Sequence, residues 1–412
     1  MKKITTTLVS MLLIGSVYSQ SWSVFPDAVP ALGRYDDIFF LDVQSGWAVT
    51  GGNGTVYKTT DGGQNWMEQF TTTTYFRNIE FLNHDIGFVG TLEEEFYRTT
   101  DGGDNWELVP LNPHPPAICG LDAVGTSTIY GCGAYFSPAY IIKSSDSGVN
   151  WEYIDMSAYA RALVEILFID EQTGYVSGNS STGGVILKTT DGGYSWTELF
   201  NSNTTGDFVW KLQLLENNTH IYGSIQSNVQ GKLVKSTDSG QTWEMKPFVD
   251  NWVQAVGFIS PSHGWMGGHS TGFYETTDGG DTWNFLGIGS NLNRIVVLSP
   301  DLAYAAGGNL YWFGKGLSVN TITESDKKAL SVVLAPNPVK DELKISIDFQ
   351  HSDNLVAELY DESGRFVKEL TTDKIEQEGS REYVIEFPYP PGVYSINIHT
   401  NNGRRSLGVI KQ

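Results

Sequence analysis

The phrase Lys58-Thr-Thr-Asp61-Gly62-Gly63-Gln-Asn-Trp66 decides the fold, because variants of it return five more times along the chain. The aspartates of the copies are 40 to 47 residues apart, at Asp61, Asp101, Asp146, Asp191, Asp238 and Asp278. A fixed period of this size is typical of solenoids, propellers and other repeat arrays. Each phrase reads as a hairpin turn, in which the carboxylate accepts backbone N–H groups and glycine adopts positive φ. The tryptophan opens the next strand and offers a large surface for burial.

Four short strand patterns lie in each repeat. After the first phrase they cover residues 66–70, 77–82, 87–91 and 96–100. Four strands of about five residues are typical of a propeller blade. Seven such units can be counted, but the last, from Trp283 to about residue 314, ends without the phrase. We predict that the strand around Trp22, which has no phrase before it, completes this seventh blade and closes the ring.

Composition narrows the classes of function. The 412 residues include 45 glycines and carry a net charge of −21, with 40% hydrophobic and 18% charged residues. This is a β-rich composition long enough for two or three domains. The acidic balance argues against a nucleic-acid partner, which needs a broad basic surface. Two cysteines without matching histidine pairs are too few for a zinc site, so we expect no metal and no cofactor.

The chain begins like an exported protein. Residues 1–19 have the pattern of a secretory signal peptide with cleavage before Gln20, although a buried N-terminal helix is the alternative. No other segment is apolar enough to predict a transmembrane segment. A hairpin that places Cys119 opposite Cys132 would allow a disulfide in an exported compartment, and two buried free thiols are the alternative.

These repeats resemble a known propeller family. The phrase is the Asp-box of sialidase-type and sortilin-type propellers, and the whole unit is most similar to the propeller of photosystem II assembly factors and their bacterial relatives. The resemblance covers about residues 20–316, and we predict a seven-bladed β-propeller over residues 20–314. It implies that the box lies on the face away from the ligand site, so that its aspartates are structural. Hydrolases, receptors and assembly factors share the box, so it does not fix the function.

After a predicted linker at residues 315–332 the pattern changes. Residues 333–412 read as a small antiparallel, immunoglobulin-like β-sandwich. They resemble the C-terminal sorting domain (type A) of the type IX secretion system of Bacteroidetes-type bacteria. The matching pieces are Pro336-Asn337-Pro338, Asp361-x-x-Gly364-Arg-x-Val367, Pro391-Gly-Val-Tyr394 and Val409-Ile-Lys411. This implies passage through the periplasm to the outside or the outer-membrane surface, with the secretion machinery and a sortase as partners. An ordinary accessory sandwich is the alternative.

The mouth of the central channel is the usual site of a propeller. Cations fall near the starts of the innermost strands at Arg34, Arg77, Arg161, Lys211 and Arg294, with aromatic residues such as Trp210 and Trp252 nearby. Converging guanidinium groups bind carboxylate, sulfate or phosphate, and the assembly factors also carry an arginine patch. The alternatives are that each cation pairs with a neighbouring carboxylate such as Asp36, Asp37 or Glu165, and that the aromatics pack between blades.

The sequence favours a non-enzymatic protein that binds a protein or polysaccharide at the cell surface. The runner-up is a carbohydrate-active hydrolase or lyase, either sialidase-like or xyloglucanase-like. Glycoside hydrolysis needs two facing carboxyl groups, but the spacing of Asp36, Asp37, Glu80 and Glu165 does not distinguish them from strand-end residues. The Arg-Ile-Pro signature of sialidases is absent from the sequence. A third possibility is a structural surface component without a ligand.

Overall fold

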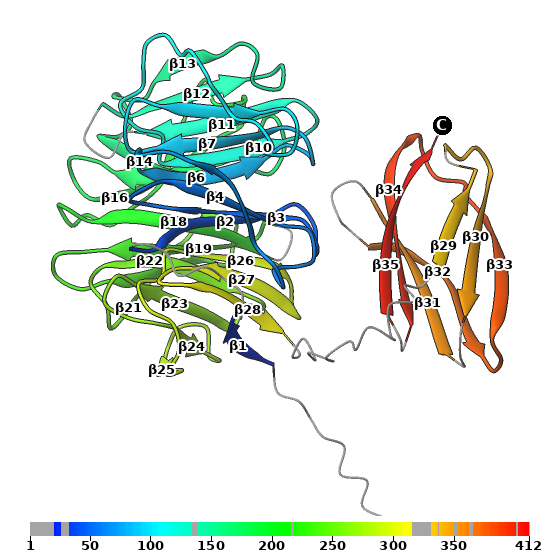
Figure 1. Cartoon of the computed structure of the whole chain (residues 1–412). Coiled ribbons are helices and arrows are strands. Elements are labelled where there is room, and N and C mark those ends of the chain that lie inside the picture. The colour runs from blue at the N-terminus through cyan, green and yellow to red at the C-terminus, as the bar shows by residue number, and fades with distance from the viewer. Residues whose placement is uncertain are drawn as a thin grey trace, which may run out of the picture. The chain divides into compact units, whose positions relative to one another are not determined.

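The computed structural model describes residues 20–25, 33–133, 138–215, 218–314, 331–336, 338–349, 353–361, 366–400 and 403–411. The predicted signal peptide and most of the predicted linker lie outside these residues. The chain divides into two compact units, Met1–Leu317 and Ser318–Gln412. In the described residues every regular element is a strand (Figure 1).

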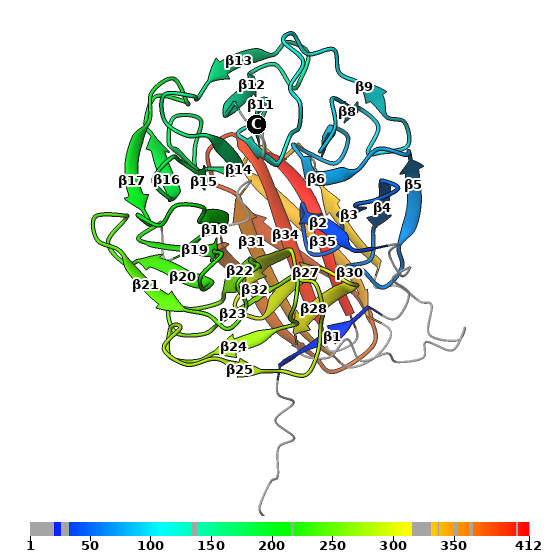
Figure 2. The ribbon, with the colours of Figure 1, turned by 90° about the vertical axis from the view of Figure 1, so that its left-hand side faces the viewer.

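The first unit contains seven four-stranded antiparallel sheets. Figure 2 shows them as blades around a centre, with β2, β6, β14, β18 and β22 innermost. The first three blades are β2 (Tyr35–Phe40), β3 (Gly46–Thr50), β4 (Thr55–Thr59) and β5 (Met67–Thr71); β6 (Phe76–Phe81), β7 (Gly87–Thr91), β8 (Phe96–Thr99) and β9 (Glu107–Leu108); and β10 (Gly120–Val124), β11 (Thr128–Gly133), β12 (Tyr140–Ser144) and β13 (Glu152–Asp155).

The remaining blades repeat this order. They are β14 (Ala162–Phe168), β15 (Gly174–Asn179), β16 (Gly184–Thr189) and β17 (Thr197–Asn201); β18 (Phe208–Leu215), β19 (His220–Gln226), β20 (Lys232–Ser236) and β21 (Glu244–Pro247); β22 (Val253–Phe258), β23 (Gly264–Gly268), β24 (Tyr274–Thr276) and β25 (Asn284–Phe285); and β26 (Arg294–Ser299), β27 (Leu302–Ala306), β28 (Leu310–Gly314) and β1 (Ser21–Val24).

The N-terminal strand closes the ring, as predicted. β1 pairs antiparallel with β28, and Trp22 lies opposite Phe313. The Trp22 side chain is buried, stacks on Phe273 at 4.2 Å and meets Trp265 edge-on at 5.3 Å. The first strand therefore brings a large aromatic surface into the junction between the sixth and seventh blades.

Each Asp-box forms the predicted turn. In the first box the Thr59 hydroxyl donates to Asp61 Oδ1 at 2.8 Å and accepts the Gly63 N–H at 2.8 Å. The Asn65 backbone N–H donates to Asp61 Oδ1 at 2.9 Å. Gly62 and Gly63 have φ of 72° and 92°, where a side chain is strained. Local hydrogen bonds within the phrase therefore explain why it recurs.

The first residue of the phrase joins neighbouring blades. Lys58 Nζ donates to the Gly102 carbonyl in the next box at 2.9 Å, and Lys143 Nζ donates to Gly192 O at 2.9 Å. The sixth phrase begins with Glu275, and the seventh blade has no box. Glu275 Oε1 instead accepts a hydrogen bond from Trp265 Nε1 at 3.1 Å and lies 2.9 Å from His263 Nε2. The sixth box therefore lacks the lysine at the one place where the next blade has no box carbonyl to accept its hydrogen bond.

The two cysteines form buried thiols rather than the predicted disulfide. Cys132 lies opposite Gly120, so Cys119 is one residue out of register with it. A one-residue offset places two strand side chains on opposite faces of the sheet. Accordingly, Cys119 packs with Phe88 and Ile118, whereas Cys132 packs with Tyr130 and Ala139.

The second unit contains two antiparallel sheets that share one apolar core. One sheet has the order β29-β30-β33 and the other β32-β31-β34-β35. Alternating residues such as Leu343, Ile345 and Ile347 point into this core. The strands are β29 (Ser331–Ala335), β30 (Glu342–Phe349), β31 (Asp353–Asp361), β32 (Phe366–Ile375), β33 (Gly379–Glu386), β34 (Gly392–Thr400) and β35 (Gly403–Lys411).

Candidate functional site

The innermost strands begin on the face opposite the Asp-boxes. In the first blade the chain runs along β2, returns through β3 and runs along β4 into the box at residues 60–66. The end of β2 and the box therefore share one face, and the start of β2 and the loop at residues 51–54 share the other. We call this second face the mouth face.

Bulges near the starts of five innermost strands shape the channel. The pairing register shifts around Asp36, Arg77, Val164, Trp210 and Gln254, so each strand holds one extra residue there. A bulge leaves one residue outside the ladder and redirects its side chain. These shifts explain why the cation positions do not align strictly when the sequence repeats are compared.

Asp36 is the centre of the first cluster of charged side chains in the channel. Arg34 Nη2 and Arg77 Nη1 both lie 2.8 Å from Asp36 Oδ1, and the Tyr75 hydroxyl donates to Oδ2 at 2.8 Å. The carboxylate is fully buried, and the Arg77 side chain is 3% exposed. The Arg77 guanidinium also lies 5.4 Å from the centre of the Trp210 ring, a cation–π distance. One carboxylate thus holds two guanidinium groups beneath the mouth.

Glu165 gathers the second cluster. Lys211 Nζ lies 2.7 Å from Glu165 Oε2, and Arg294 Nη1 lies 2.5 Å from Oε1. Arg294 Nε is also 3.5 Å from Asp37 Oδ1. Burial acts to raise the pKa of Glu165, but Arg294 and Lys211 outweigh it and lower that pKa. Burial raises the pKa of Asp37. Four of the predicted cations are therefore paired with carboxylates.

Further acids link neighbouring innermost strands. The Phe168 N–H of β14 donates to Asp122 Oδ2 of β10 at 2.6 Å, and the Ile79 N–H of β6 donates to Asp37 Oδ2 at 3.2 Å. Burial raises the pKa of Asp122 to about 8 and that of Glu80 well above its usual value. Burial therefore favours the neutral form of these neighbouring acids, and the Asp122 carboxyl accepts a hydrogen bond that joins its blade to the next.

A shallow pocket of about 300 Å³ opens on the mouth face. Its lining comes from loops of several blades and consists of Gly33, Arg34, Gly51, Gly52, Tyr75, His269 and Asn291. Arg34 Nη1 lies 2.6 Å from His269 Nε2, so the arginine donates to a neutral imidazole. Burial, together with Arg34 and Arg77, lowers the pKa of His269 to about 4. The pocket therefore presents one guanidinium, a neutral imidazole, an amide and a phenol ring.

The structure separates the predicted site residues. Arg34 lines the pocket. Trp252 lies beside the pocket residue His269, because the Trp252 carbonyl accepts the His269 N–H at 3.2 Å, and the Trp252 side chain is 47% exposed. Arg77 and Trp210 are buried beneath the mouth. Lys211 and Arg294 belong to the Glu165 cluster, and Arg161 is exposed outside the pocket lining.

Sequence reasoning missed His269 and Asn291. His269 directly follows β23, the place that Gly51 takes after β3 in the first blade. Aligning the residues that follow the second strand of each blade would have found it. Asn291 lies in the loop before β26, and no motif marks it. In the described residues, no group of histidine, cysteine and acidic side chains is arranged to hold a metal ion. Those residues also include no helix suited to crossing a membrane.

Comparison with known proteins finds a matching family model in part of the first unit and in the second unit. Residues 16–152 match the family described as photosynthesis system II assembly factor YCF48, and residues 333–412 match the secretion system C-terminal sorting domain. No curated protein matches the chain.

Solved structures share the fold at low identity. A structure of YCF48 bound to D1 peptide is 21% identical, covers 71% of this chain and 96% of its own, and has a TM-score of 0.56. YCF48 from Cyanidioschyzon merolae is 22% identical, covers 71% and 98%, and has a TM-score of 0.55. PorZ of Porphyromonas gingivalis, a surface component of the type-IX secretion system, is 14% identical, covers 94% and 60%, and has a TM-score of 0.53.

A glycoside hydrolase also shares the fold. The GH74 enzyme of Niastella koreensis is 14% identical, covers 95% of this chain and 74% of its own, and has a TM-score of 0.56. The sorting-domain match indicates a chain exported by the type IX secretion system. The chain therefore joins a BNR-type propeller similar to that of the YCF48 assembly factors to a C-terminal sorting domain of that secretion system.

Proposed function

We propose that this protein is an exported, non-catalytic binding module whose propeller takes an acidic group of a protein or polysaccharide at the mouth face. The observation that carries this proposal is the pocket in which Arg34, His269 and Asn291 converge. A concave site with a few convergent polar groups is typical of ligand binding. Arg77 lies beneath the pocket and shares Asp36 with Arg34, so the two guanidinium groups together carry one positive charge more than that carboxylate.

The state of the carboxylates supports binding rather than hydrolysis. Asp36, Asp37, Glu80 and Glu165 are all buried, and Asp36 and Glu165 are each held by two cations. A glycosidase needs one carboxyl group as acid and another as base or nucleophile, both reaching the substrate. In the described residues the pocket lining includes no carboxylate.

Structures with a similar fold support a protein ligand, but they do not identify which protein is bound. One similar propeller was solved with a D1 peptide bound, and PorZ is described as a bacterial surface component. The similarity to GH74 enzymes keeps a carbohydrate-active hydrolase as the second candidate. In the proposal the exported chain remains at the outer-membrane surface or is released by a sortase after passing through the periplasm.

Binding of defined acidic probes by the full chain tests this proposal. We would titrate polygalacturonate, neutral dextran and a peptide rich in aspartate, each at two salt concentrations. The proposal predicts that at least one acidic probe binds, that salt weakens it, and that Arg34→Ala lowers the affinity by about tenfold, a loss of about 1.4 kcal/mol.

Arg161→Ala is the matched control, because Arg161 is exposed and outside the pocket lining. Arg34→Ala leaves the buried Asp36 with Arg77 as its remaining cation, so the unfolding temperature of the variant is measured beside its affinity. Equal affinity of the Arg34→Ala and wild-type proteins, or binding of neither acidic probe, would contradict the proposal.

A further inference from the structure

Described residues from or beside the pieces of sequence that mark the sorting domain lie together at one end of the second unit. Val339 forms a parallel bridge with Lys411, which is also the register partner of Gly392. Asp361, the last residue of β31, pairs with Tyr394. The Phe387 N–H donates to the Asp341 carbonyl at 2.8 Å. Segments up to 72 positions apart, between Val339 and Lys411, therefore meet at this end.

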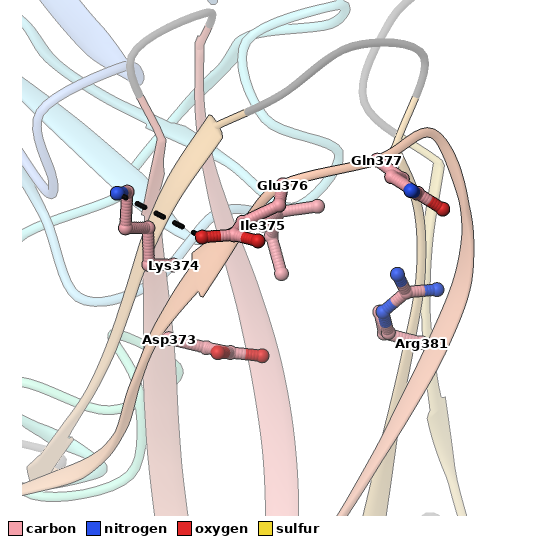
Figure 3. Close-up of a pocket in the computed structure, with 6 residues that line it drawn as sticks. All are labelled: Asp373, Lys374, Ile375, Glu376, Gln377 and Arg381. Carbon is pink, nitrogen blue, oxygen red and sulfur yellow. Dashed lines mark ion pairs between the residues drawn. The ribbon is translucent and has the colours of Figure 1, made fainter.

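The other end of the unit is built from different segments. There Phe349 pairs with Gly379, Asp353 pairs with Ile375, and Thr400 pairs with Gly403. Figure 3 shows a shallow depression near this end, between Lys374, Glu376, Gln377 and Arg381. Lys374 and Glu376 form a long ion pair at 3.9 Å, and because their side chains are 78% and 79% exposed it adds little to stability.

Every proline after residue 330 lies at the first end. Of the 15 prolines in the chain, the five in this region are Pro336, Pro338, Pro388, Pro390 and Pro391, and all are exposed. They follow the ends of β29 and β33 and precede β34. Proline has a fixed φ and no N–H, so exposed proline segments keep an extended backbone without internal hydrogen bonds.

An aromatic cluster holds these segments in place. The Tyr394 hydroxyl donates to the Pro390 carbonyl at 2.9 Å. Phe387 lies 4.9 Å from Tyr389 and 5.6 Å from Tyr394 between ring centres. Because the prolines sit on a packed base, docking onto them would order few side chains, which lowers the entropic cost of association.

We infer that this proline end, comprising Pro336, Pro338, Pro388, Pro390, Pro391 and the exposed Lys340 that follows the Val339 bridge, is the surface by which the export machinery holds the chain. Extended proline segments dock into aromatic-lined grooves, so the partner is a protein of the outer-membrane export apparatus that presents such a groove. The inference rests on the export assignment made above. Prolines that merely stop strands from pairing with other chains are the structural alternative.

Export of the full chain in a bacterium with a type IX secretion system tests the inference. We compare Pro388→Ala/Pro391→Ala, Lys340→Glu, and the far-end control Lys374→Ala/Gln377→Ala (Figure 3). The two proline-end variants should accumulate inside the cell, with export reduced by about tenfold, the effect of losing about 1.4 kcal/mol of docking. The control should be exported like the wild type.

Thermal unfolding of the retained proteins separates docking from folding. Lys340 is exposed, so Lys340→Glu removes no packing and should unfold at the wild-type temperature. Wild-type export of both proline-end variants would overturn the inference, as would equal retention of the far-end control. Undiminished export of a chain lacking residues 333–412 would instead overturn the export assignment itself.

Discussion

At the scale of single residues, the channel shows how burial changes the role of an acidic side chain. Asp36 and Glu165 each lie against two cations, and at Glu165 these cations outweigh burial and lower the pKa of the carboxyl. Among the described residues no cation forms an ion pair with Asp122, and burial raises its pKa to about 8. An acidic side chain therefore pairs with two cations in one blade, whereas in another it accepts a backbone hydrogen bond from the next blade.

The raised pKa of Asp122 predicts a pH dependence of stability. The folded pKa of about 8 lies above the unfolded value of about 3.9, so the contribution of Asp122 to stability is fully present below pH 4 and is lost as pH rises towards 8. Asp122→Asn keeps an oxygen for the Phe168 N–H and removes the titrating group. We expect the variant to gain about 1–3 kcal/mol at pH 8 relative to the wild type.

Urea unfolding at pH 4.5 and pH 8 measures this difference. The exposed substitution Asp85→Asn is the control and should leave the pH profile unchanged. An Asp122→Asn profile that falls between pH 4.5 and pH 8 as steeply as the wild type would show that another group carries the dependence.

At the scale of elements, the Asp-box is a turn whose hydrogen bonds are internal to the phrase, which is why it could be predicted. The bulges in the innermost strands could not, because Asp36, Arg77 and Trp210 belong to ordinary strand patterns. Those bulges decide which side chains meet around the axis. The disulfide prediction was wrong for a related reason, since the hairpin register was estimated one residue off.

The box aspartates predict acid sensitivity. Hydrogen bonds from the turn lower the pKa of Asp101, Asp146, Asp191, Asp238 and Asp278 to about 2. These depressed values contribute stability that is present above about pH 4 and is lost as pH falls towards 2. We expect Asp191→Ala to lower the unfolding temperature at pH 7 by about 2–6 °C and to make the acid transition shallower.

Calorimetry between pH 7 and pH 2.5 checks both effects. Asp85→Ala changes an exposed aspartate outside the boxes and should follow the wild-type curve. If Asp191→Ala also follows that curve, the hydrogen bonds of this box do not stabilise the blade.

At the scale of the whole molecule, the ring is closed by a strand from the far end of the sequence. The sequence predicted this closure because the seventh unit lacks a box and the Trp22 strand has no box before it. It also predicted cations near the channel, and in the structure most of these cations form ion pairs with buried carboxylates. The mouth pocket itself depends on loops of several blades, so His269 and Asn291 meet Arg34 only in the folded ring.

Ring closure predicts a strong effect of Trp22. Trp22→Ala removes a buried indole from contact with Trp265, Phe273 and Phe313, and should cost about 3–5 kcal/mol. Trp252→Ala makes the same change at an exposed position and should stay within about 0.5 kcal/mol. Denaturant unfolding of both variants measures the contrast, and equal stabilities would refute the closure role of the first strand.

If the mouth binds its ligand without catalysis, the ligand should leave the protein chemically unchanged. The most direct measurement is mass spectrometry of polygalacturonate and of bacterial and plant glycans after incubation with the full chain. We expect each glycan to be recovered intact, including any that binds and is released by salt. New fragments from the wild type that disappear with Glu165→Gln would contradict this expectation and identify an enzyme.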